Sequence, residues 1–152
     1  MMGKPQVPIE VDDGTGVWTV DGVPMILLPR HFFINNHNAI GAALGAERSE
    51  ALAWEAGYKS AYTWCEQECV THGLSGVEVF HHYMKRLSQR GWGQFRVQSV
   101  DVATGAARID VANSVFVLQQ PDAGRRLCHA FRGWFCGSLD YAGHALGLGW
   151  TL

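Results

Sequence analysis

The sequence predicts a domain of mixed α and β structure, in which long helices alternate with antiparallel hairpins. Short turn sequences between apolar runs indicate hairpins near residues 17–28 and 95–111. Longer stretches with helical spacing of apolar residues occupy most of the remaining chain. The length of 152 residues is typical of one domain and is sufficient to bury a sizeable core.

The N-terminal segment is predicted to be a loose arm followed by a hairpin. Residues 1–16 are rich in Pro, Asp and Gly, which favours irregular structure. Asp21-Gly22 then separates two apolar runs, 17–20 and 23–28, and this dipeptide is a strong signal for a hairpin turn. Because prolines interrupt the second run, we expect an edge position or a short strand.

Four helices are predicted after the hairpin. Apolar spacing is helical from about residue 38 to residue 72, and Gly45 separates a short first helix from a long second one. A further helix spans 75–90 and begins with a capping box, in which Ser75 is the expected N-cap. The last helix is predicted over 122–146.

A second hairpin is expected between the last two helices. Apolar residues alternate along 107–111, and the turn follows a strand at 95–102. Residues 115–118 are a candidate extension of this sheet. Residues 148–152 have the pattern of half a strand without a partner, so we expect a removed or disordered segment after them.

A small-residue pattern occurs on two of the predicted helices. Residues 57–61 and 133–137 both read Gly-aromatic-x-x-small. Such a pattern allows another element to approach closely, whereas a direct role of the glycines in ligand binding is the alternative reading. We expect Gly57 and Gly137 to lie at close packing contacts.

Charge and composition exclude several classes of partner. The formal net charge is −2, whereas nucleic acids and anionic membranes require a concentrated basic face. The N-terminus lacks the apolar stretch of a secretory signal, and the longest apolar run, 23–28, is too short to span a bilayer. Four cysteines do not indicate a disulfide scaffold. We therefore expect a cytoplasmic protein with reduced thiols.

Common catalytic and metal-binding motifs are missing from the sequence. It contains no Walker loop, G-x-S-x-G, H-E-x-x-H or C-x-x-C motif, so we predict no catalytic residues. Cys65, Cys69 and His72 share one face of the long helix, and thiolate and imidazole suit zinc. Cysteine is also a good small buried residue, and structural zinc sites use close cysteine pairs on turns, so we favour a buried core and expect no metal there.

Aromatic residues are concentrated around the second hairpin and the last helix. They are consistent with a plain core or with the wall of a small-molecule cavity. If these residues line a cavity, polar groups from His82 and Tyr141 would orient the ligand in it. Its predicted lining comprises Trp92, Phe95, Phe116, Phe131, Trp134 and Tyr141.

Short glycine-based motifs recur along residues 28–148. They are Glu55-Ala56-Gly57, Gly91-Trp92-Gly93, Asn113-Ser114, and Cys128 ahead of Gly133-Trp134-Phe135-Cys136-Gly137. Their order resembles the 4-vinyl reductase domain family. The resemblance predicts one such domain over 28–152, preceded by an N-terminal arm and hairpin over 1–27.

This resemblance implies an α+β fold in which an antiparallel sheet packs against long helices, as in the related TRAPP trafficking subunits. It also implies a homodimer with an enclosed apolar pocket. Family members include a protein linked to vinyl reduction in bacteriochlorophyll synthesis and sensor domains of aromatic-responsive transcription activators. The sensors hold zinc through a Glu and three Cys. Cys128 resembles the first of these cysteines, but no other ligand is matched, so we expect no zinc.

The resulting functional prediction is non-catalytic binding of a small apolar or aromatic ligand, as a sensor or accessory protein. One alternative is a 4-vinyl reductase-type enzyme or subunit that acts on a tetrapyrrole and takes reducing power from a partner. A structural interaction module like the trafficking subunits is the other alternative.

Overall fold

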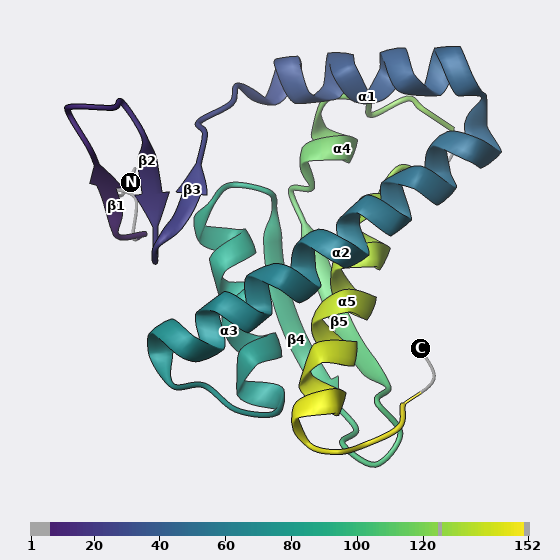
Figure 1. Ribbon diagram of the computed structural model, residues 1–152. Helices are drawn as coiled ribbons and strands as arrows, with labels where there is room; N and C mark the ends of the chain where they lie inside the picture. The colour runs from purple at the N-terminus through teal and green to yellow at the C-terminus, as the bar shows by residue number, and fades with distance from the viewer. Residues whose placement is uncertain (1–6, 125, 151–152) are drawn as a thin grey trace.

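Two long helices cross at the centre of the molecule, and the other elements lie around them (Figure 1). The computed structural model describes residues 7–124 and 126–150. The strands within these residues are β1 (Ile9–Val11), β2 (Trp18–Val20), β3 (Val23–Met25), β4 (Gln94–Val100) and β5 (Ala107–Ala112). The helices are α1 (Arg30–Leu44), α2 (Ala46–His72), α3 (Val77–Gln89), α4 (Val115–Leu118) and α5 (His129–Ala145).

The architecture is α+β, as the sequence predicts. β1, β2 and β3 form one antiparallel sheet in that order, and β4 pairs with β5 in a second antiparallel sheet. α3 packs against β4 and α5. α2 crosses α5 and forms the most extensive contact between any two of the described elements. None of the described helices is long and apolar enough to cross a membrane.

The N-terminal segment contains more structure than its composition predicts. The hairpin at Asp21-Gly22 is confirmed, and both turn residues have positive φ, 52° and 76°. The expectation of a loose arm over 1–16 is wrong for β1, which pairs with β2. Asp12 accepts the backbone N–H of Gly14, and the resulting turn directs β1 back along β2. Residues 1–6 lie outside the described residues.

Two expected boundaries at the start of the domain are wrong. The second hairpin strand ends at Met25 instead of residue 28, and the first helix begins at Arg30 instead of residue 38. The Phe33 ring packs edge-on against Trp92 and Phe116, at centroid distances of 5.0 Å and 5.6 Å. These long-range contacts favour an additional two turns of helix that local periodicity did not indicate.

The starts of the later helices also differ from the prediction. Gly76, with a φ of 54°, precedes α3, so the expected capping box with Ser75 as N-cap does not form. α5 begins at His129 instead of residue 122, because Gly124 has a φ of 61° that an α-helix does not accommodate. The predicted end of α5 is confirmed within one residue.

The second hairpin is confirmed, but its expected extension is wrong. Residues 115–118 form the short helix α4, because Asn113 leaves the strand conformation with a φ of 55° and Ser114 Oγ accepts the Phe116 N–H. Residues 148–150 are irregular, so the expected half-strand does not form within the described residues. The Trp150 indole donates to the Val102 carbonyl at 3.1 Å. Residues 151–152 lie outside the described chain.

The crossing of α2 and α5 depends on glycine, as the small-residue pattern predicts. A Cβ placed on Gly57 would lie 2.5 Å from the Ala130 carbonyl oxygen. A Cβ on Gly133 would overlap the Trp54 carbonyl, and one on Gly137 would overlap the Tyr58 carbonyl. Because the obstructing atoms belong to helix backbones, they cannot move aside as a flexible side chain would. The prediction of close contacts at Gly57 and Gly137 is therefore confirmed.

Replacing Gly57 with leucine should destabilise the protein by about 1–3 kcal/mol or more, because the side chain would separate α2 from α5. Thermal or denaturant unfolding measures the effect. Gly41→Ala is the matched control, since its Cβ would lie 3.8 Å from the nearest atom, Ser49 Oγ. That control should be neutral or slightly stabilising in a helix interior. Melting of Gly57→Leu within about a degree of the parent would contradict the packing prediction.

A polar contact also joins the two crossing helices. The Tyr58 hydroxyl donates to the Asp140 carboxylate, and this hydrogen bond, together with burial, raises the pKa of Tyr58 to about 12. Since the pKa is raised on folding, the associated stability is complete below the ordinary value near 10 and is lost as pH rises through 12.

Tyr58→Phe should therefore lower the free energy of unfolding by about 1–2 kcal/mol at pH 8. This difference between parent and variant should shrink as pH rises from about 10 to 12. Urea unfolding at a series of pH values measures it. Tyr62→Phe is the control, because that hydroxyl bonds the exposed His144 ring. A difference that stays constant across this pH range would contradict the assignment.

Candidate functional site

A cavity of about 630 Å³ lies between the N-terminal hairpin and the helices α2 and α3. Residues 22–25 of the hairpin form one wall. The opposite walls come from faces of α2 and α3 and from two tryptophans, Trp92 after α3 and Trp134 on α5. These lining residues are Lys59, Ser60, Thr63, Trp64 and Gln67 of α2, Tyr83, Leu87 and Arg90 at α3, and Trp92 and Trp134.

Helical spacing explains how the two helices present these side chains. The α2 residues Ser60, Trp64 and Gln67 follow one another by four and three positions, so they share one face. Tyr83, Leu87 and Arg90 repeat the same spacing on α3 and its C-cap. The β2–β3 turn then places the hairpin opposite both faces, and a concave apolar space remains between them.

Arg90 is the notable polar group of the cavity. Its guanidinium carbon lies 4.5 Å from the centroid of the Trp64 ring, an arrangement that favours a cation–π contact. Within the described residues, its buried Nε and Nη2 atoms have no hydrogen-bond partner. Burial lowers the pKa of Arg90, but an arginine side chain remains charged in proteins. Arg90 therefore places a cation at the cavity wall, with two buried donors that lack an acceptor within the described residues.

Five of the seven predicted site residues come together in one aromatic cluster. Phe131 contacts Phe95, Phe116 and Trp134, with centroid distances of 5.1, 5.0 and 5.0 Å. Trp92 contacts Trp134 at 4.9 Å. Phe95, Phe116 and Phe131 are core residues, whereas Trp92 and Trp134 reach the cavity wall.

The other two predicted residues lie apart from this cluster. Tyr141 packs edge-on against Tyr62, with ring centroids 5.2 Å apart. A hydrogen bond to Cys69, together with burial, raises the pKa of Tyr141. His82 turns toward α2, where its Nε2 lies 2.6 Å from Glu68 Oε2.

Sequence reasoning missed Trp64, Tyr83, Arg90 and the hairpin wall. The shared face of Ser60, Trp64 and Gln67 is a signal that the sequence does contain. Without the fold, however, that face cannot be distinguished from an ordinary core stripe. The position of the hairpin over α2 and α3 is a long-range contact that no local pattern encodes.

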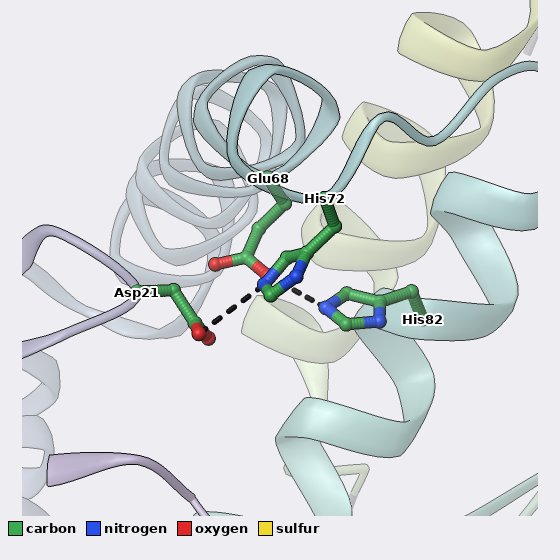
Figure 2. A group of neighbouring side chains, drawn as sticks. All are labelled: Asp21, Glu68, His72 and His82. Atoms are coloured by element: carbon green, nitrogen blue, oxygen red, sulfur yellow. Dashed lines mark hydrogen bonds and ion pairs between the residues drawn. The ribbon is translucent and has the colours of Figure 1, made fainter.

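A second group of polar side chains lies next to the cavity. Figure 2 shows Asp21 from the hairpin turn, Glu68 and His72 from α2, and His82 from α3 pointing toward one another. We call these four residues the two-histidine cluster. Burial raises the pKa of Glu68 to about 7 and lowers that of His82 to about 4.

The zinc ligands implied by the family resemblance are not assembled around Cys128. Its Sγ lies 3.3 Å from Ser114 Oγ, and among the described residues it belongs to no group of three or more potential metal ligands. Cys65 is fully buried, and desolvation raises its pKa, which disfavours the thiolate that binds metal. Within the described residues, Cys128 thus lacks neighbouring ligands and Cys65 lacks the thiolate character that a sensor-type zinc site uses.

Comparisons with known proteins identify the fold and the family. The chain resembles a solved structure described as the phenol-responsive sensory domain of the transcription activator PoxR with phenol. The TM-score is 0.73 and the sequence identity 17%, over 91% of this chain and 72% of that chain. No curated protein is significantly similar in sequence. Residues 3–98 match a family described as a domain of unknown function, DUF5943, and since this is more than half of the chain, the protein belongs to the DUF5943 family.

Proposed function

We propose that this protein binds a small aromatic molecule in the cavity beneath the N-terminal hairpin, and acts as a sensor or accessory protein. The observation that carries the proposal is the cavity itself, whose wall combines Trp64, Tyr83, Trp92 and Trp134 with Arg90. Its volume of about 630 Å³ lies within the range of small-molecule sites. Flat aromatic faces and one cation are a lining suited to an aromatic ring with a polar substituent.

The fold supports a binding role over a catalytic one. The similar PoxR domain is described as phenol-responsive, and that description includes bound phenol. We propose that residues 28–152 form a domain of 4-vinyl reductase type, as the glycine motifs imply. Residues 1–27 would then add the hairpin that covers the cavity.

Arg90 supports a ligand that carries an acidic group. Within the described residues its buried Nε and Nη2 atoms have no hydrogen-bond partner, and a small rotation of the guanidinium over the Trp64 ring would turn both toward the two oxygens of a carboxylate. A phenol offers one oxygen to the same donors. We therefore propose an aromatic carboxylate as the preferred ligand chemistry.

Benzoate should quench or shift the tryptophan fluorescence saturably, because three tryptophans line the cavity. The ring centroids of Trp92 and Trp134 lie 4.9 Å apart, and the Trp64 ring contacts Arg90. Arg90→Met keeps most of the apolar volume but removes the donors. It should weaken benzoate binding roughly 10–100-fold, since hydrogen bonds to charged groups contribute about 1.5–3 kcal/mol. Phenol binding should weaken less.

Trp18→Leu is the matched control for this titration. Trp18 is an exposed tryptophan of β2 that does not line the cavity, so its loss should leave the affinity unchanged. Trp92→Leu should remove most of the fluorescence response while the circular dichroism spectrum stays that of the parent. Equal benzoate affinity for the parent, Arg90→Met and Trp92→Leu proteins would exclude this cavity as the binding site.

We also propose that the protein is a homodimer, as the family resemblance implies. Large apolar side chains are exposed on the segment before α1 and along α1 itself, which favours burial against a second copy. They are Ile26, Leu27, Leu28, Phe32, Ile40 and Leu44. Light scattering after size exclusion should give twice the chain mass of 16.7 kDa. Leu27→Lys together with Phe32→Lys should give the monomer mass, and a monomeric parent protein would contradict the proposal.

A further inference from the structure

We infer that the two-histidine cluster is a binding site for a divalent transition-metal ion, with Zn²⁺ as the ion of best fit. Each of its four residues offers one ligand atom, and these atoms all lie within 4.8 Å of one another. Two imidazole nitrogens and two carboxylate oxygens form a mixed donor set that zinc accepts in four-coordinate sites. This inference concerns a site separate from the aromatic cavity and does not depend on the proposed ligand.

Two distances from His72 suit a tetrahedral ion. Ligand atoms about 2.0–2.2 Å from zinc lie about 3.3–3.6 Å from one another around a tetrahedron. His72 Nε2 lies 3.2 Å from Asp21 Oδ1 and 3.3 Å from Glu68 Oε2. His82 Nε2 approaches the same Glu68 oxygen at 2.6 Å, and a small rotation of its ring would admit the ion.

Burial of Glu68 is an independent indication that a cation belongs in the cluster. Its side chain is fully buried, and within the described residues its Oε1 atom has no hydrogen-bond partner. Leaving a buried carboxylate oxygen without a partner costs free energy. The Asp21 side chain, which is 4% exposed, faces the same space and adds a second carboxylate. An ion held by both Glu68 oxygens and by Asp21 would give Oε1 a partner as well.

Arg86 holds one ligand in the orientation that the ion requires. Its Nη2 atom lies 2.7 Å from Asp21 Oδ2, which leaves Oδ1 directed toward His72. Polar partners outside the ligand set orient metal-binding carboxylates in known sites, and this ion pair would act in the same way. Arg86 Nε is farther from Glu68, at 4.0 Å, and forms no hydrogen bond within the described residues. The arginine therefore supports Asp21 and leaves Glu68 available.

The ligands come from three separate parts of the fold, so the ion would join them. Asp21 belongs to the β2–β3 turn, Glu68 and His72 to the last turns of α2, and His82 to α3 (Figure 2). Because zinc would bind the folded arrangement and not the unfolded chain, it would stabilise the hairpin against both helices.

Metal content tests the site directly. The purified chain, stripped with a chelator and dialysed against micromolar Zn²⁺, should retain roughly one zinc per chain by elemental analysis. Loss of a ligand's hydrogen-bond partner weakens metal binding roughly 10–100-fold. Glu68→Gln and His72→Asn each remove a ligand itself, so each should weaken zinc binding by more than that. His72 is partly exposed, so its variant should fold even where the buried Glu68→Gln does not.

Exposed neighbours provide the matched controls. Glu66→Gln on α2 and His81→Asn on α3 change the same residue types at exposed positions and should retain zinc like the parent. A parent protein that retains no zinc at micromolar concentration overturns the inference. So does a His72→Asn protein that binds zinc as tightly as the parent, or zinc that is lost on Cys128→Ser instead.

Thermal unfolding gives a second readout. Zinc should raise the melting temperature of the parent protein by several degrees, and Asp21→Asn should reduce this shift. Asparagine tolerates the positive φ of 52° at that position, so the hairpin turn should persist in the variant. An equal zinc-dependent shift in the parent and Asp21→Asn proteins would show that the hairpin turn is not part of the site.

Discussion

The glycine-lined crossing of α2 and α5 is the constraint on which the rest of the molecule depends. At Gly57, Gly133 and Gly137 the two helix backbones touch without an intervening side chain. This contact fixes the distance and rotation of the helices, because backbone atoms cannot repack as side chains do. With α2 held in this way, Trp64 faces the hairpin, and Trp134 of α5 reaches the same space.

The N-terminal hairpin completes the site. Its turn supplies Asp21 to the two-histidine cluster, and the next residues, 22–25, form a wall of the aromatic cavity. On α2, Gln67 lines the cavity and the adjacent Glu68 enters the cluster. The cluster and the cavity thus share the same three elements, so any change that loosens the hairpin from the helices would affect both.

Local sequence patterns predicted the features that depend on local chemistry. The Asp21-Gly22 turn and the Gly57 and Gly137 contacts follow from residue types that permit positive φ or close approach. The predictions of secondary structure fail where contacts between residues distant in sequence determine the local conformation. α1 begins early because Phe33 packs on Trp92 and Phe116, and residues 115–118 become helical after the positive φ of Asn113. Likewise, Glu68 and His82 meet only through the packing of α2 on α3.

The most direct test of the central claim, that an aromatic ligand binds between the hairpin and the helices, is amide hydrogen exchange with and without saturating benzoate. Ligand in the cavity should slow exchange in β2, β3 and the intervening turn, because it would hold the hairpin against α2 and α3. The β4–β5 hairpin, which does not line the cavity, should be unaffected. Protection confined to β4 and β5, with unchanged exchange over residues 18–25, would contradict the claim.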